Sequence, residues 1–208
     1  MRHEPCAPKN AGSEQPQRPV MSALTDLPAF GPDGDIQVVV EAPRGSAVKL
    51  KYEPQLGAFS VARALPRGLT YPFDWGFVPG TLGPNGDPLD ALVMHDTSTY
   101  PGVVLPCRLL GVVELSQRGT EGGRQRNDRI IAMPVWHDRL GELEHAADLP
   151  ARLRKEIGLF FLDATFFTNK NAKILGWNSP QKARLLLESG EKRYRKQRRQ
   201  LQRVTGST

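Results

Sequence analysis

Two aspartates, Asp87 and Asp90, lie three residues apart at the end of a predicted turn. The turn is the run GPNGDP from Gly83 to Pro88, whose residue types break regular structure and favour a tight turn. At this spacing, one hard cation or one water could contact both carboxylates. Taken alone, however, Asn85-Gly86 is more typical of an ordinary β-hairpin turn with Asp87 as a local cap.

The turn interrupts a longer stretch, Tyr71 to Val93, that reads YPFDWGFVPGTLGPNGDPLDALV. Before the turn, Phe73, Trp75 and Phe77 recur with the period of two that is expected for one face of a β-strand. After the turn, the chain continues from Leu89 as a short apolar strand. The stretch therefore combines strand-forming and acidic residues in a short span.

This stretch resembles the signature of the soluble family I inorganic pyrophosphatases, which runs from Tyr-Pro-x-x-aromatic-Gly to an acidic D-G-D-P-x-D. The residues that match its spacing without a gap are Tyr71, Pro72, Trp75, Gly76, Gly86, Asp87, Pro88 and Asp90. The resemblance covers about Ile36 to Trp177. It implies hydrolysis of pyrophosphate, or of a related diphosphate, with Mg²⁺ as the cofactor and Mn²⁺ as an alternative.

The resemblance also implies a role for each matching residue. The residues that it assigns to the phosphates are Lys49, Arg63, Trp75 and Arg129. Arginine suits phosphate through its rigid fork of donors and lysine through its compact charge, although Lys49 and Arg63 taken alone would be solvated charges on strands. The expected catalytic residues are Tyr71 and Asp87. The expected metal ligands are Glu41, Asn85, Asp87, Asp90 and Asn127.

Several residues depart from the family pattern where acids are expected. Asn85 replaces the first aspartate of the turn, and Gln117 and Asn127 fall where two further aspartates belong. Lys51 stands in place of a glutamate, and Asp128 should point to the other face of its strand. Because Mg²⁺ is bound by hard anionic oxygens, each lost charge weakens its binding. We therefore expect hydrolysis to be impaired, or shifted to another diphosphate.

The family also carries a Tyr-Lys pair after the helix that contains two successive phenylalanines, here Phe160 and Phe161, and this pair is missing. The aligned residues are Ala164 and Thr165. Lys170 or Lys173, a few residues further along the chain, is the candidate that would supply the missing cation.

The residues assigned to the site lie on a series of predicted β-strands. Their apolar or alternating patterns predict strands at Ile36–Glu41, Val48–Tyr52, Ala58–Arg63, 103–115 and Arg129–Pro134. Short turns and a polar loop from Gln117 to Asn127 separate them, which indicates an antiparallel meander rather than βαβ units. With the resemblance, this predicts an α+β fold: an OB-like five-stranded antiparallel β-barrel with two flanking α-helices.

Two helices are predicted after the strands. The first has Asp148 as its N-cap and Pro150 in its first turn. Its core-facing stripe comprises Leu149, Leu153, Ile157, Phe160 and Phe161. The second begins at Ser179-Pro180, places Ala183, Leu186 and Leu187 on one side, and ends before Gly190.

The charge is concentrated at one end of the 208-residue chain. Residues 191–203 carry seven Lys or Arg and one Glu, which equals the whole net charge of +6 and leaves the remainder neutral. Residues 1–35 are rich in Pro, include several Gly, and show no periodicity. We therefore predict a disordered extension at 1–35, a barrel domain at 36–190 and a basic tail at 191–208.

Cysteine and hydropathy patterns bear on the compartment. Cys6 and Cys107 form no disulfide framework, and no apolar run is long enough to span a bilayer. A cytoplasmic protein with no membrane partner is therefore expected. His95, His137 and His145 show no metal-ligand spacing. The resemblance further implies a homo-oligomer.

Two other functions remain open at this stage. A non-catalytic phosphate- or nucleotide-binding relative would use Lys49, Arg63 and Arg129 to bind without generating hydroxide. A nucleic-acid-binding barrel with a basic tail is the other alternative. The neutral charge of the body and the absence of an alternating basic-aromatic strand argue against nucleic acid as a partner.

Overall fold

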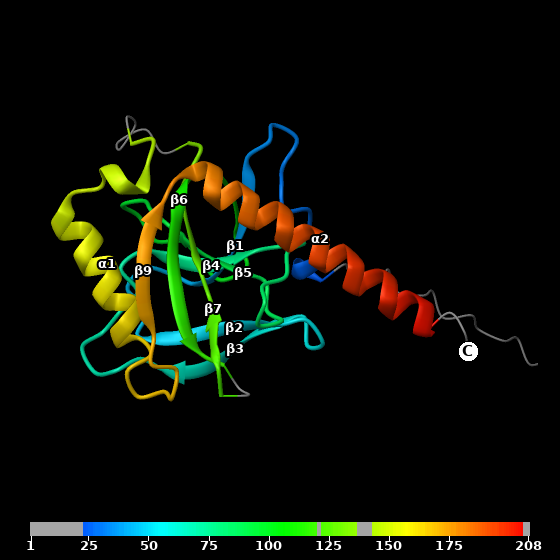
Figure 1. The fold of residues 1–208 in the computed structure, drawn as a ribbon, viewed down its shortest axis with the longest axis horizontal. Coiled ribbons are helices and arrows are strands. Elements are labelled where there is room, and N and C mark those ends of the chain that lie inside the picture. Colours follow the sequence, from blue (N-terminus) through cyan, green and yellow to red (C-terminus); the bar gives the residue numbers. More distant parts are fainter. Residues whose placement is uncertain (1–22, 120–121, 137–142, 206–208) are drawn as a thin grey trace, which may run out of the picture.

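The computed structural model describes residues 23–119, 122–136 and 143–205. Five strands pair in a closed ring (Figure 1): β1 (Ile36–Ala42), β4 (Asp74–Val78), β5 (Leu89–Val93), β8 (Arg129–Pro134) and β6 (Val104–Arg118). The ring closes because β6 pairs with β8 and also with β1. The predicted five-stranded barrel is therefore confirmed.

The expectation that the barrel is entirely antiparallel is wrong for one pair of strands. Strands β5 and β8 run parallel, and the other four pairs of the ring are antiparallel. The reason is geometric, since the directions of neighbouring strands cannot alternate all the way around a ring of five. One pair must run in the same direction.

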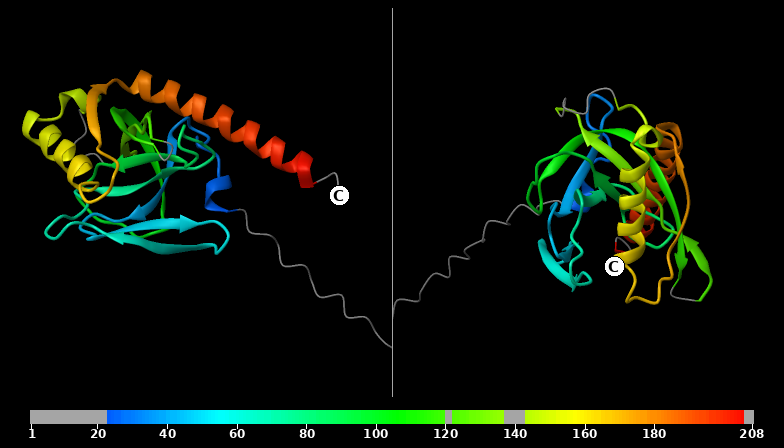
Figure 2. Two further views of the ribbon diagram at one scale, coloured as in Figure 1. Left: turned by 60° about the horizontal axis from the view of Figure 1, so that its bottom comes forward. Right: turned by 90° about the vertical axis from the view of Figure 1, so that its left-hand side faces the viewer.

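The remaining strands lie outside the ring. Strands β2 (Val48–Glu53) and β3 (Ala58–Ala64) form a separate antiparallel hairpin, on the opposite side of the barrel from α2 (Figure 2). Strands β7 (Arg124–Arg126) and β9 (Lys173–Asn178) both pair with β6. Strand β9 was not expected, and the polar loop is shorter than expected because β6 continues to Arg118.

The first long helix, α1 (Ala151–Asp163), carries the predicted core-facing stripe. Leu149, Ile157, Phe160 and Phe161 are buried, and Leu153 packs against the same cluster. The predicted cap is wrong, because Asp148 ends a short 3₁₀ helix, η2 (Ala146–Asp148), and Pro150 occupies the N-cap position without a side-chain hydrogen bond.

Helix α2 (Pro180–Thr205) is longer than expected and projects beyond the barrel (Figure 1). Gly190 does not end it, although glycine is unfavourable inside a helix. The Gly190 carbonyl accepts a hydrogen bond from the Leu82 N–H at 3.1 Å, and Arg193 donates to the Leu82 carbonyl at 2.7 Å. The expected basic tail is therefore the second half of α2, as far as Thr205.

Residues 23–35 were expected to be disordered but pack against the barrel. They include a 3₁₀ turn, η1 (Leu24–Asp26), and the fully buried Ala29. Tyr194 and Arg198 of α2 both donate hydrogen bonds to Asp26. The expectation for residues 1–22 falls outside the described residues.

The barrel strands bury side chains on both faces. On β5, Leu92 belongs to a cluster with α1, whereas Ala91 and Val93 belong to a cluster that includes Ala183 and Leu187 of α2. This alternation follows the period of two of a strand. In the described ranges, with their gaps at 120–121 and 137–142, no helix combines the length and apolarity needed to cross a membrane.

A single methyl group at Gly76 should test how closely β1 and β4 approach. A Cβ there would lie 2.0 Å from the Val39 carbonyl oxygen, a backbone atom that cannot move alone. We expect Gly76→Ala to destabilise the fold by about 2–3 kcal/mol and to lower the thermal midpoint by roughly 5–10 °C. Differential scanning calorimetry would measure this change.

Gly123→Ala is the matched control, because a Cβ at Gly123 meets no atom within 4 Å. We expect its thermal midpoint to stay close to that of the wild type. Equal stability of the two variants would contradict the close packing of β1 on β4.

Candidate active site

Most of the residues assigned to the site from the sequence converge on one cavity of about 360 Å³. It lies between the β2 strand, the turn before β5, and the start of β8. The charged side chains that line it are Glu41, Lys49, Lys51, Glu53, Asp87, Asp90, Arg129 and Lys170. Carboxylates and bases are therefore present in equal number, which is the chemistry of a site for a charged ligand.

The turn before β5 positions the first aspartate. The Gly83 N–H donates to the Asp87 carbonyl at 2.7 Å, and Asn85 Nδ2 donates to Asp87 Oδ2 at 3.2 Å. Both predicted features are present, since the turn joins the antiparallel strands β4 and β5 and also presents Asp87 at the cavity. The Asp87 side chain is 54% exposed.

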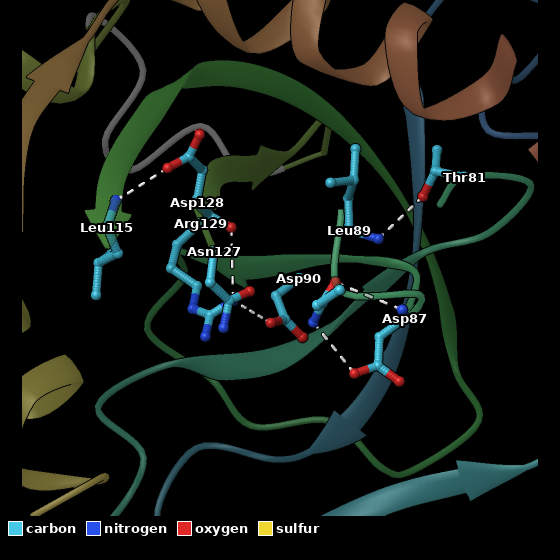
Figure 3. Close-up of polar contacts among 9 residues, drawn as sticks. Thr81, Asp87, Leu89, Asp90, Leu115, Asn127, Asp128 and Arg129 are labelled. Carbon is cyan, nitrogen blue, oxygen red and sulfur yellow. Dashed lines mark hydrogen bonds and ion pairs between the residues drawn. The ribbon is translucent and has the colours of Figure 1, made fainter. Parts of the chain in front are cut away.

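The parallel pairing of β5 and β8 brings the second aspartate beside an arginine (Figure 3). The first residues that pair between β5 and β8 are Ala91 and Ile130. Asp90 and Arg129 directly precede these two residues, and they form an ion pair. Arg129 Nη1 also donates to Asn127 Oδ1 at 2.7 Å. The guanidinium group lies 5.2 Å from the centroid of the Trp75 ring, within the range of a cation–π interaction.

Trp75 itself is buried below this guanidinium group. Its Nε1–H is buried and finds no hydrogen-bond acceptor among the residues that the structure describes. Buried donors normally have a partner. The indole nitrogen is therefore a donor that a ligand oxygen could satisfy.

Strand β2 contributes two lysines to the same cavity. Lys49 and Lys51 are two residues apart and so share a face of the strand. Lys51 Nζ lies 3.4 Å from Asp87 Oδ1, and the Asp87 charge raises the pKa of Lys51. The residue that stands where the resemblance expects an acid thus places a fixed cation against a candidate metal ligand.

Glu41, on β1, is a buried carboxyl group with one backbone partner. Its side chain accepts a hydrogen bond from the Tyr52 N–H at 2.9 Å. Burial raises the pKa of Glu41 to about 7, the Asp90 charge adds to this, and the Tyr52 hydrogen bond opposes it. Near neutral pH, Glu41 is therefore only partly ionised.

Three predicted site residues do not line the cavity: Trp75, Tyr71 and Arg63. Tyr71 is buried in the core, with ring centroids of Trp75 and Phe160 at 6.0 and 5.1 Å, and burial raises the pKa of its hydroxyl. Arg63 donates a hydrogen bond to the Ala164 carbonyl. Their catalytic and substrate-binding roles stay predictions.

Of the two lysines considered as substitutes for the missing Tyr-Lys pair, Lys170 lines the cavity. It is partly buried, and desolvation lowers its pKa, followed by the charges of Lys49 and Arg129. Lys173 is exposed on β9. Gln117 is buried and lines an adjoining cavity together with Asn85 and Asp87.

Asp128 points away from this site, as expected. Its Oδ1 accepts a hydrogen bond from the Leu115 N–H at 3.0 Å (Figure 3). It also accepts one from Arg126 Nε at 3.0 Å. His95 is buried, with Nε2 3.1 Å from Asp74 and Nδ1 2.9 Å from Thr97 Oγ1. His137 lies outside the described residues.

Sequence reasoning missed Thr25, Tyr194 and Gln197, which also line the cavity. They come from segments that were expected to be disordered or solvated. The contacts of Asp26 with Tyr194 and Arg198 join these segments, and no local pattern signals such a long-range contact.

Comparisons with known proteins agree with this architecture. The sequence model of the family described as inorganic pyrophosphatase matches residues 38–195. The inorganic pyrophosphatase of Nostoc sp. is 33% identical over 172 residues, which cover 83% of this chain and 99% of the relative. The inorganic pyrophosphatase of Thermus thermophilus is 34% identical over 169 residues, which cover 78% of this chain and 93% of the relative.

Solved structures give the same result. The crystal structure of inorganic pyrophosphatase from Thermus thermophilus superposes with a TM-score of 0.76 at 32% identity, covering 83% of this chain and 99% of that one. The inorganic pyrophosphatase from Helicobacter pylori gives a TM-score of 0.71 at 30% identity, covering 81% and 98%.

The raised pKa of Glu41 should appear in the pH dependence of stability. Because the folded-state pKa lies above the ordinary value of 4.5, ionisation penalises the folded state increasingly as the pH rises through about 7. Glu41→Gln keeps an acceptor for the Tyr52 N–H and removes that penalty. We expect the variant to gain about 2–3 kcal/mol relative to the wild type between about pH 5 and about pH 8.

Urea unfolding at each pH would measure this difference. Glu156→Gln, in an exposed pair with Arg152 on α1, is the control and should show little dependence on pH. A stability difference for Glu41→Gln that stays constant over this range would rule out the raised pKa.

Proposed function

Because this chain belongs to the inorganic pyrophosphatase family, we propose that it hydrolyses inorganic pyrophosphate to two phosphates in the cavity between β2 and β5. The observation that carries this proposal is the convergence of bases on the two aspartates of the turn and of β5. Four bases line the cavity: Lys49, Lys51, Arg129 and Lys170. Lysine and arginine side chains are suited to binding the phosphate groups of pyrophosphate.

The bases whose N–H donors are not used within the protein are the proposed substrate-binding groups. Within the described residues, every hydrogen bond of Arg129 is donated by Nη1, which leaves Nε and Nη2 for a phosphate oxygen. Lys49 and Lys170 make no ion pair with any described residue. Trp75 does not line the cavity, so its assignment to the substrate rests on the family resemblance alone.

Asp87 is the proposed catalytic base. Its exposed carboxylate is placed to accept a proton from a water that attacks one phosphorus atom. The bond from that phosphorus to the bridging oxygen breaks, and the second phosphate leaves with its charge held by the surrounding lysines and Arg129. Tyr71 would act from beneath, through its packing on Trp75.

Family I pyrophosphatases are metal-dependent, and Mg²⁺, with Mn²⁺ as the alternative, is the metal that we propose. The side chains do not fit a resident ion: in the described part of the chain, no three His, Cys, Asp or Glu are grouped as metal ligands would be. Asp87 and Asp90 are already paired with bases, and Asn85 and Asn127 offer only neutral oxygens. Any Mg²⁺ used in hydrolysis would therefore be held mainly by pyrophosphate oxygens rather than by the protein.

A non-catalytic phosphate- or nucleotide-binding function is the second candidate. It is favoured by the two asparagines at Asn85 and Asn127, where the family resemblance expects aspartates. Binding of nucleic acid has less support, because the bases outside α2 are balanced by acids. A homo-oligomeric state and a cytoplasmic location are proposed from the family resemblance and the cysteine pattern.

The direct test is phosphate release from pyrophosphate in a Mg²⁺ titration. We expect measurable turnover by the wild type and a decrease in kcat of about 100-fold or more for Asp87→Asn, because that change removes the proton acceptor but keeps the shape. Asp163→Asn, at the exposed end of α1, is the control and should keep wild-type turnover. No turnover by the wild type at any Mg²⁺ concentration would favour the non-catalytic candidate.

Lys170 and Lys173 should differ in the same assay. Lys170→Gln removes a partly buried charge at the cavity and is expected to raise KM about tenfold with a smaller change in kcat. Lys173→Gln, on the exposed strand β9, should leave KM unchanged. A larger effect from Lys173 would mean that the substrate lies elsewhere.

A further inference from the structure

Each of the two aspartates of the cavity lies beside a basic side chain. Asp90 forms an ion pair with Arg129, and Asp87 lies 3.4 Å from Lys51 Nζ (Figure 3 shows the first pair). The third acid that the sequence suggested as a metal ligand, Glu41, is buried and accepts a hydrogen bond from the Tyr52 N–H at 2.9 Å. Each of the three carboxylates therefore already has a partner in the protein.

The position of Arg129 is specific. Its Nη1 bridges Asp90 Oδ2 and Asn127 Oδ1, the side-chain oxygens of two expected metal ligands. Only 11% of the arginine side chain is exposed, and Trp75 packs against the guanidinium group. Because arginine stays protonated in proteins, this positive charge is permanent. A divalent ion at those oxygens would have to displace it.

The two other bases of the cavity, Lys49 and Lys170, are available to bind a ligand. Lys49 and Lys170 line the same cavity and have no carboxylate partner among the described residues. The lowered pKa of Lys170 is due first to burial and then to Lys49 and Arg129, which agrees with like charges converging on one space. The four acids and four bases of the cavity balance overall, and Lys49 and Lys170 are the two bases that no ion pair with a described residue occupies.

We infer that Lys51 and Arg129 act as built-in counter-cations in place of resident divalent ions, so that the cavity binds the diphosphate group in its metal-free form. The ligand class is inorganic pyrophosphate and other molecules with an exposed diphosphate. The identity of the ligand rests on the proposed function, whereas the independence from metal rests on the two ion pairs.

Calorimetric titration of the full chain with pyrophosphate, in EDTA and then in Mg²⁺, tests this inference. We expect binding in EDTA, weakened about tenfold or more in Lys51→Gln, because one charge-assisted contact is lost. Lys51 is exposed, so this variant should fold normally. Lys51→Glu should have a larger effect than Lys51→Gln, because it replaces the cation with an acid. We expect it to lose pyrophosphate binding in EDTA and to retain pyrophosphate binding in Mg²⁺.

Two further variants locate the bound anion within the molecule. Lys196→Gln, on the exposed basic face of α2, controls for pyrophosphate held by that helix and should bind like the wild type. Arg129→Lys keeps the charge but not the bridge, and should weaken binding in EDTA while thermal unfolding shows a folded protein.

The outcomes separate this inference from the proposed function. Binding that requires Mg²⁺, or that Lys51→Gln leaves unchanged in EDTA, overturns the inference even if phosphate release is observed. Binding in EDTA without phosphate release in Mg²⁺ supports the inference and refutes the proposed hydrolysis. Loss of binding in Lys196→Gln alone would place the anion on α2 and also overturn the inference.

Discussion

Closure of the five-stranded ring depends on β6, which pairs with β1 at its start, with β8 along its middle and with β9 towards its end. A register shift between Leu109 and Gly111 marks where the strand changes course. Because a ring of five cannot alternate throughout, one parallel pair is unavoidable, and it falls between β5 and β8. That pair places Asp90 beside Arg129. The charge arrangement of the site therefore follows from how the barrel closes.

The cavity combines permanent charges with few free anions. Arg129 is held by Asp90, Asn127 and Trp75, and Lys51 of the hairpin β2–β3 faces Asp87. The Arg129–Asp90 pair is largely buried and holds its geometry, because separating it would leave a charge without a partner, whereas the Lys51–Asp87 pair is about half exposed. Family membership and the local chemistry thus point in partly different directions: the fold is that of a metal-dependent hydrolase, while the side chains carry part of the positive charge themselves.

Much of the fold could be predicted from local patterns. The strand Arg129–Pro134 has the predicted bounds, and the apolar stripe of α1 is buried as expected. The errors occur where a long-range contact decides the structure. Strand β9 has little pattern of its own and forms because β6 offers an edge, and α2 continues past Gly190 because Leu82 and Arg193 hold it against the barrel.

For the site, the sequence alone determined which residue types are present and their spacing around the turn, because these are local properties of a matching signature. It therefore identified Asp87, Asp90 and Arg129 together with the missing acids. Only the tertiary structure decided which charges meet, since that depends on strand register and on the direction of β8. It selected Lys170 over Lys173 and paired Lys51 with Asp87. It also brought Thr25 and Tyr194 to one cavity, because contacts between distant segments have no local signal.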